Sequence, residues 1–259
     1  MILRDALYVA WRELLKFFRA RTRLVVAVIQ PLLWLGLMGN MMQGLAQNPF
    51  VERLLGTGSY LAFMTPGVLL MTVLFGGVFA GMSIVWDRRI GYLEKLLAAP
   101  ISRAAIPLGK MLAAAVQGGF QGLLILLIAT GLGVRFATGL PGALFALLVA
   151  MVFSFTLSGF SLALAVRLKS QETLMAVVNF FTMPLMFTSN ALFPREAMPR
   201  WLAAVAQVNP VTHAVTPIRQ VLLSGWDWMG MGPSLLVIGG LALLMLVVAG
   251  RSFGRATVE

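Results

Sequence analysis

The chain has 259 residues, of which 59% are hydrophobic and only 11% are charged. A soluble domain is about 45–50% apolar and about 25% charged, so this composition excludes an ordinary soluble globule. The stretches without Asp, Glu, Lys or Arg are 24–51, 54–86, 111–134, 136–166, 173–194 and 228–250. Fewer than one hundred residues lie outside them. This remainder is too short for a nucleotide-binding domain or any other large soluble catalytic domain.

Each of these six stretches is longer than the roughly 20 residues that cross a hydrocarbon core about 30 Å thick. They therefore predict an all-α membrane protein with six transmembrane helices in a single transmembrane domain, residues 1–259. The expected spans are about 24–45, 60–86, 111–133, 141–166, 173–192 and 230–250.

The basic residues indicate the orientation of these spans. The chain has 20 Lys and Arg against 9 Asp and Glu, a net charge of +11. Fifteen of the basic residues fall on the two termini and every second loop, and five fall on the loops between. The positive-inside rule then places both termini in the cytoplasm. Because the bases are divided among loops, they do not form the single basic face that nucleic-acid binding would need.

Residues 1–23 are expected to form an interfacial helix on the cytoplasmic surface. Apolar residues recur there every three or four positions: Leu3, Leu7, Trp11, Leu14, Leu15 and Phe18. Bases such as Arg4 and Lys16 lie elsewhere on the helical wheel, near the expected lipid headgroups. Asp5 and Glu13 in this segment, and the long apolar stretch after it, argue against a cleaved signal peptide.

The six stretches contain no carboxylate, lysine or arginine, and the only histidine, His213, lies outside them. Carriers driven by protons or sodium usually need a buried charge for coupling, so the sequence disfavours a secondary transporter. With 16 Met and 17 Phe in the chain, scattered amides and hydroxyls could line a path for varied amphiphiles. The candidates for this path are Asn40, Gln117, Gln121, Asn179, Thr182, Ser189 and Asn190. For each of them, ordinary interhelical packing is the alternative.

The cytoplasmic loop 87–110 carries a second amphipathic segment. Gly91 can open a short helix, and Pro100 follows just past its expected end. Leu93, Leu96 and Leu97 fall on one face of that helix. We expect this helix to lie parallel to the membrane and to insert its apolar side into a partner.

The outer segment 193–228 contains a further charge-free run, residues 201–218. Prolines and polar residues interrupt it, and a seventh crossing would place the C-terminal arginines outside. We therefore expect short helices that dip into the outer surface or lie along it.

Three motifs in order resemble the type-2 ATP-binding-cassette (ABC) exporter permeases, and within them most closely the daunorubicin-resistance type of drug-efflux permease. The first lies in the cytoplasmic loop and comprises Arg89, Gly91, Leu93, Glu94, Leu97, Pro100, Ser102, Arg103, Gly109 and Lys110. Tyr92 stands where that family commonly has Thr. The second motif is MPLMFTSNALFP, residues 183–194, and the third comprises Pro199, Trp201, Asn209, Pro210 and Arg219.

The resemblance implies a permease that dimerises with a second copy of itself or a paralogous permease and docks two cytoplasmic ATPase subunits. It assigns coupling to the ATPase to Arg89, Gly91, Leu93, Glu94, Leu96, Leu97 and Pro100. It assigns an outer gate to Phe193, Pro194, Pro199, Trp201, Asn209 and Pro210. The chain would lie with membrane lipids in a bacterial-type inner membrane and export a drug, antibiotic, lipid or glycan-lipid.

The sequence has no G-x-x-x-x-G-K-[ST] phosphate loop, so the chain is not expected to be an enzyme. We expect it to bind no cofactor or metal, with ATP and Mg held by the partner ATPase. Two other functions stay open. One is an ATP-independent channel or secondary carrier, and the other is a membrane scaffold that transports nothing.

Overall fold

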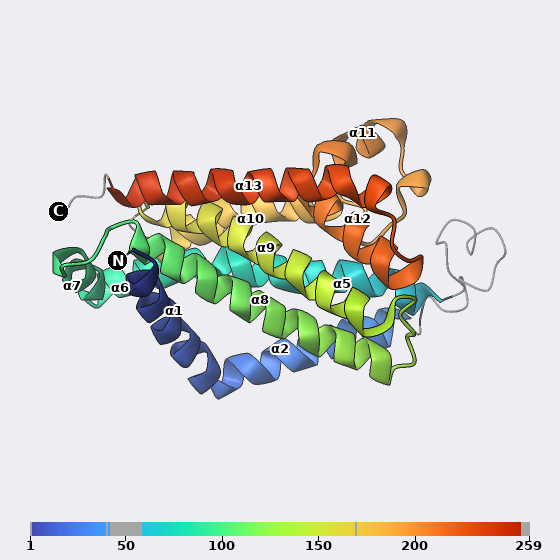
Figure 1. The fold of residues 1–259 in the computed structure, drawn as a ribbon, viewed down its shortest axis with the longest axis horizontal. Helices are drawn as coiled ribbons and strands as arrows, with labels where there is room; N and C mark the ends of the chain where they lie inside the picture. Colours follow the sequence, from blue (N-terminus) through green and yellow to red (C-terminus); the bar gives the residue numbers. More distant parts are fainter. Residues whose placement is uncertain (1, 40, 42–58, 169, 255–259) are drawn as a thin grey trace.

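The computed structural model describes residues 2–39, 41, 59–168 and 170–254. These residues form helices joined by turns, with no β-strand among them (Figure 1). The longest helices lie side by side as an elongated bundle. The three central ones are α5 (Tyr60–Val78), α8 (Ala105–Gly131) and α9 (Gly139–Ala165). The expected all-α fold is confirmed for this part of the chain.

The core helices approach closely because small residues meet where they cross. Gly77 of α5 lies against the backbone of Ser154 in α9, and Gly118 of α8 lies against the Ser154 side chain. The Ser154 hydroxyl donates to the Ala114 carbonyl at 2.7 Å, which joins α9 to α8. Such contacts let backbones pack tightly where apolar burial alone gives little drive between helices in a membrane.

The second expected span extends from α5 through a 3₁₀ turn, Phe79–Gly81, into α6 (Met82–Arg89). Ser161 of α9 holds this turn: its hydroxyl accepts from the Gly81 amide at 3.1 Å and donates to the Val78 carbonyl. A side chain from a neighbouring helix thus makes hydrogen bonds to the backbone where the α-helical pattern is interrupted, as an interruption at membrane depth requires.

The N-terminal segment forms two helices, α1 (Ile2–Arg19) and α2 (Arg21–Leu33), followed by a π-helical turn, Trp34–Met38. The axes of the two helices bend by 68° at their junction. One face of α1 packs on α8, where Ala6 and Val9 lie against Gly109. A neighbouring face leaves Leu3, Leu7 and Trp11 exposed, as expected for an interfacial helix. Figure 1 shows α1 and α2 as an elbow below α8.

Among the described residues, four helical segments are long and apolar enough to cross a membrane: Tyr60–Arg89, α8, α9 and α13 (Trp228–Gly254). The bent pair α1 and α2 makes a fifth if it counts as one span. Helix α10 (Gln171–Phe187) occupies the expected fifth window with 17 residues. The total of six spans therefore stays a prediction.

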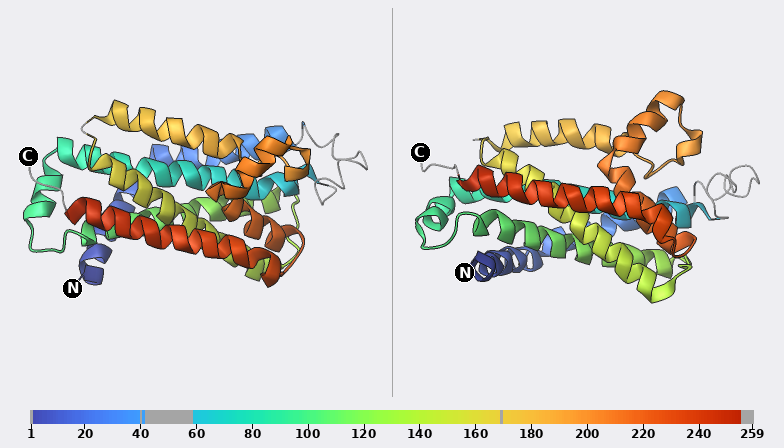
Figure 2. Two further views of the ribbon diagram at one scale, coloured as in Figure 1. Left: turned by 90° about the horizontal axis from the view of Figure 1, so that it is seen from above. Right: turned by 45° about the horizontal axis from the view of Figure 1, so that its top comes forward.

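The expected outer segment contains a 3₁₀ turn, Arg195–Ala197, and two helices, α11 (Arg200–Val208) and α12 (Pro210–Leu223). It is therefore not one continuous seventh span. Figures 1 and 2 show α11 and α12 at one end of the bundle. The start of α1, the end of α13 and the short helix α7 (Tyr92–Ala98) lie at the other end. The side of the membrane on which each end of the bundle lies stays a prediction.

The close approach of α5 to the turn after α10 makes Gly67 a sensitive position. A Cβ on Gly67 would overlap the Ala191 carbonyl oxygen and lie 2.8 Å from its carbonyl carbon, and backbone cannot move aside as a flexible side chain can. We expect Gly67→Ala to destabilise the protein by about 1–3 kcal/mol. Thermal unfolding in detergent, followed by tryptophan fluorescence, measures the effect.

The matched control is Gly239→Ala in α13, where no heavy atom lies within 4 Å of the added Cβ. Ala is the better helix former by roughly 0.5–1 kcal/mol, so this variant should unfold at the parent temperature or above. Equal unfolding temperatures for Gly67→Ala and the parent would contradict the close contact.

Candidate functional site

A buried cluster of charged side chains joins α1, α6 and α8. Lys110 of α8 is 2% exposed and Asp87 of α6 is 0% exposed. The Lys110 Nζ lies 2.7 Å from Asp87 Oδ2, 2.9 Å from Glu13 Oε1 of α1 and 2.9 Å from the Ser83 hydroxyl. An ammonium group has three N–H bonds, so all the donors of Lys110 are used inside the protein.

Two further cations from α1 complete this charge cluster, which we define as Arg12, Glu13, Lys16, Asp87 and Lys110. Arg12 lies 3.0 Å from Glu13 and 3.3 Å from Asp87, and Lys16 lies 3.2 Å from Asp87. Three cations face two carboxylates, so the cluster keeps one net positive charge. Buried charges are retained when they are paired and hydrogen-bonded in this way.

The charge cluster was not predicted from the sequence. Asp87 and Lys110 each lie one residue outside a charge-free stretch. The sequence pattern therefore assigns both to the cytoplasmic loop and not to a span. Their opposite signs at the facing ends of two consecutive spans were the signal that could have suggested a pair. The third member, Glu13, is 97 residues from Lys110 in sequence, and no local pattern connects the two.

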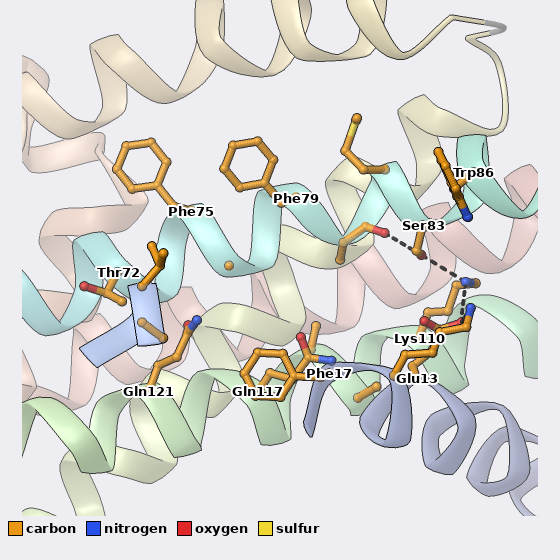
Figure 3. A pocket seen from close by; sticks show the side chains of 18 of the residues that line it. Glu13, Phe17, Thr72, Phe75, Phe79, Ser83, Trp86, Lys110, Gln117 and Gln121 are labelled. Carbon is orange, nitrogen blue, oxygen red and sulfur yellow. Dashed lines mark hydrogen bonds and ion pairs between the residues drawn. The ribbon is translucent and has the colours of Figure 1, made fainter. Parts of the chain in front are cut away.

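Beside the charge cluster, a cavity of about 440 Å³ lies between the elbow of α1 and α2 and the helices α5 and α8. Glu13, Lys16 and Lys110 form its charged end. In Figure 3, Phe75 and Phe79 stand on one side of α5, and Gln117 and Gln121 of α8 lie on the other. The remaining lining residues are Phe17, Val26, Ala27, Gln30, Thr72, Gly76, Ala80, Met82, Ser83, Trp86, Ala113, Ala114 and Gln171.

The cavity combines aromatic and amide surfaces along its length. The Phe75 and Phe79 rings are stacked with centroids 6.4 Å apart and an angle of 22° between their planes. The Gln121 Oε1 atom is buried without a hydrogen-bond partner among the described residues. From Thr72 to Trp86 the helical path is about 20 Å at 1.5 Å per residue. The lining of the cavity therefore combines aromatic rings with amide side chains.

The sequence placed seven residues on a possible path, and the structure separates them. Gln117 and Gln121 line the cavity. Asn179 is exposed on α10, and Thr182 is buried there. Ser189 and Asn190 lie in the turn after α10, at the end of the bundle that holds α12. Asn40 lies outside the described residues. Thus two of the seven share one cavity, and the four others that the structure describes do not line it.

The predicted short helix in the cytoplasmic loop is present as α7. Gly91 precedes it with φ of +69°, a left-handed conformation that glycine adopts readily, and Pro100 follows it. Leu93 is buried within the chain, and Leu96 and Leu97 are half-buried against its core. Their apolar face therefore packs inward, which differs from the expected insertion into a partner. The exposed positions in this stretch are Arg89, Ile90, Glu94, Lys95, Ala98 and Pro100.

The end of α6, before α7, is anchored to α9. The Arg88 guanidinium donates to the carbonyls of Val166 and Leu168, each at 2.9 Å. These carbonyls follow the last turn of α9, where helix carbonyls lack partners within the helix. A cation at a helix C-terminus also complements the helix dipole. Arg88 therefore fixes the base from which α7 extends.

At the opposite end of the bundle, polar contacts attach α12 to the end of α10. Asn209 accepts from the Val211 amide at 2.8 Å and donates to the Leu185 carbonyl at 2.8 Å. Arg219 donates to the carbonyls of Asn190 and Ala191 at 2.8 and 2.9 Å. Of the predicted gate residues, Phe193, Pro199 and Trp201 are exposed, Pro194 and Pro210 are half-buried, and Asn209 is buried.

The bundle, the helix α7 and the divided outer segment can be compared with known proteins. The sequence model of ABC-2 type transporters matches residues 5–223. The chain belongs to the ABC-2 type transporter family. The predicted resemblance is thereby confirmed. The chain is a multi-pass membrane subunit of an ABC transporter, and membership in the ABC-2 family implies an ABC ATPase as its partner.

Named relatives agree with this ABC-2 assignment. The putative transport permease ycf38 of Cyanophora paradoxa is 34% identical over 224 residues, 84% of this chain and 73% of that protein. The daunorubicin resistance ABC transporter permease protein DrrB1 of Streptomyces coeruleorubidus is 27% identical over 243 residues, 94% and 83% of the two chains. The probable multidrug ABC transporter permease YbhR of Escherichia coli (strain K12) is 27% identical over 166 residues, 63% and 44% of the two chains.

The charge cluster predicts a large effect of removing its buried cation. In Lys110→Met the side-chain volume is kept, but Asp87 and Glu13 lose the ammonium group between them. Breaking a buried ion pair from one side costs about 3–5 kcal/mol, so we expect a much lower unfolding temperature and yield. Thermal unfolding of the purified permease in detergent gives the measurement.

Arg4→Gln is the control, because Arg4 is on the same α1 helix and its side chain is 72% exposed. Its ion pair with Asp5 is 3.8 Å long, and exposed pairs contribute about 0–1 kcal/mol. If Lys110→Met and Arg4→Gln unfolded at the same temperature, the buried cluster would not stabilise the fold.

Proposed function

We propose that this chain is the permease subunit of an ABC exporter that moves a hydrophobic or amphiphilic compound outward across the membrane. The partner ATPase would hydrolyse the ATP and hold its Mg, while this chain binds no nucleotide, cofactor or metal. The observation that carries the proposal is the cavity of about 440 Å³, with its rings and amides, inside a chain of the ABC-2 family.

The cavity supports a substrate the size of a drug. Sites for such ligands range from about 300 to 1,000 Å³ and are lined by apolar and aromatic groups with a few polar ones. The wall that contains Phe75 and Phe79 suits a planar ring system, and the amides of Gln117 and Gln121 add polar groups to the lining. Names of two relatives, for daunorubicin resistance and multidrug transport, fit an amphiphile of this kind.

In the proposed mechanism, the ATPase docks on the exposed side of α7. Arg89, Glu94 and Pro100 are available there, whereas Leu93, Leu96 and Leu97 transmit force inward because they pack on the chain's own core. Closure of two ATPases on ATP would push α7, and α6 would carry that displacement into the second span. Gly91 supports this role by setting the angle at which α7 leaves α6.

The outer gate in this proposal is the segment 193–228, in which α12 is attached to the end of α10. The hydrogen bonds of Asn209 and Arg219 to the end of α10 and the turn after it make α10 and α12 move together. Outward release would then accompany a displacement of α10, whose ring side chains Phe180 and Phe187 are exposed. Such an uncovered apolar helix supports dimerisation with a second copy or a paralogous permease.

The orientation proposed for the chain is the one that the basic residues predict. Both termini and α7 would face the cytoplasm of a bacterial-type cell, and the segment that contains α11 and α12 would face outward from its inner membrane. The exposed face of α1 would lie among lipid headgroups. No nucleic-acid partner is proposed.

The proposal is tested by reconstituting the chain with an ABC ATPase from the same genome in inside-out vesicles. We expect ATP to drive uptake of daunorubicin, followed by its fluorescence, and daunorubicin to stimulate ATP hydrolysis. An ATPase variant that binds but does not hydrolyse ATP is the control. Uptake without ATP would instead favour a channel or carrier, and an absence of both uptake and stimulation across a panel of amphiphiles would favour a scaffold.

Gln121→Leu tests the cavity as the substrate site. The change removes the uncommitted amide, so compounds that donate a hydrogen bond should lose about 1–2 kcal/mol of binding, roughly 5- to 30-fold, relative to compounds without a donor. Apparent affinities come from ATPase stimulation curves. Thr130→Val, a polar-to-apolar change on α8 outside the cavity, should leave the order of compounds unchanged. An unchanged order in Gln121→Leu as well would assign this glutamine to packing.

A further inference from the structure

The charge cluster has two sides, and each side meets a different part of the proposed transport machinery. Glu13, Lys16 and Lys110 line the cavity. Arg12, the neighbour of Glu13 on α1, is not a lining residue and lies over the ring of Tyr92 in α7. The cavity and the helix α7 are therefore connected through adjacent side chains of one cluster.

Arg12 is held on three sides. Its guanidinium carbon lies 3.4 Å from the centroid of the Tyr92 ring, well within the roughly 6 Å of a cation–π contact. Its nitrogens lie 3.0 Å from Glu13 and 3.3 Å from Asp87. A guanidinium is flat and rigid, so stacking and ion pairing together fix both its position and its plane. A displacement of Tyr92 must therefore displace Arg12 or break these contacts.

Tyr92 is the first residue of α7, so its ring moves when that helix moves. It follows Gly91, where the chain turns away from α6. Lys16 also lies near the same ring, at 5.9 Å from its centroid.

We propose that Arg12 is a positioning residue that joins α1 to α7 through Tyr92, so that the cavity wall and the ATPase-docking helix move as one unit. A ligand against Glu13 and Lys16 then changes the position of α7, and ATP-driven movement of α7 changes the wall of the cavity. The coupling between the ligand and ATP-driven movement rests on the proposed export function. The mechanical joint between α1 and α7 does not.

The joint is tested by distance measurements on the complex with its ATPase. The chain contains no cysteine, so Tyr8→Cys on α1 and Ala98→Cys on α7 provide two unique, exposed positions for nitroxide labels. In complexes in which only one permease copy carries the two labels, we expect one narrow distance distribution by pulsed electron resonance, the same without nucleotide and after trapping with ATP and vanadate. Adding Tyr92→Ala or Arg12→Gln should broaden it, whereas Tyr92→Phe, which keeps the ring, should not.

The coupling is tested by the ratio of daunorubicin-stimulated to basal ATP hydrolysis in the same complexes. We expect Tyr92→Ala and Arg12→Gln to lower this ratio by about twofold or more, because the contact is worth about 0.5–2 kcal/mol. Tyr92→Phe and the surface control Arg4→Gln should keep the parent ratio. Co-purification of the ATPase with each variant separates lost coupling from lost assembly.

An unchanged distance distribution in both Tyr92→Ala and Arg12→Gln would overturn the joint. A narrow distribution that shifts on ATP trapping in the parent would overturn it too, because α1 and α7 would then move separately. An unchanged stimulation ratio in these variants would overturn the coupling. Absence of stimulation in the parent would count against the proposed function, and the label distances would still decide the joint.

Discussion

The ammonium group of Lys110, enclosed by two carboxylates, is the interaction on which the rest of the structure depends. Desolvating an isolated charge of this kind costs several kcal/mol, so Lys110, Glu13 and Asp87 are stable only together. They come from α8, α1 and α6, and the requirement that they meet fixes the relative positions of these three helices. The second half of α1, which contains Glu13, cannot leave the bundle without leaving a buried charge unpaired.

The cavity follows from this constraint and from the small residues of the core. Glycines and serines hold α5, α8 and α9 close together, so little space remains between those helices. The charge cluster holds α1 against the ends of α6 and α8, and the 68° bend then carries α2 away from α1. The cavity therefore lies between this elbow and the helices α5 and α8, with charges at one end and rings and amides along its sides. Packing and charge together therefore produce a cavity of mixed polarity.

Much of the fold could be predicted because it is encoded in local patterns. The charge-free stretches 54–86, 111–134 and 136–166 correspond to the segment Tyr60–Arg89 and to α8 and α9. Gly91 and Pro100 mark the limits of α7, and the pair Asn209 and Pro210 marks the start of α12. Each of these signals acts within a few residues, so the sequence alone contains it. The motif order also identified the family correctly.

The features that were not predicted depend on pairings between distant residues. Hydrophobic periodicity placed Leu93 on an apolar face but could not decide whether that face turns toward a partner or toward the chain's own core. Composition selected Gln121 and Asn179 equally, and only the packing of α8 and α10 separates the cavity amide from the exposed one. Arg12 and Tyr92 are 80 positions apart in the numbering, and no local pattern around either residue indicates their contact.

The sequence distance between Glu13 and Lys110 has a consequence for biosynthesis. During translation α1 and the end of the second span emerge first, each with a carboxylate that has no buried cation to meet. Their partner is synthesised 97 residues after Glu13, at the start of α8. Until then both acidic groups must stay in the hydrated headgroup region, because hydrocarbon would exclude them. The N-terminal helix therefore takes its final place only after the third span has entered the bilayer, as a late step of assembly.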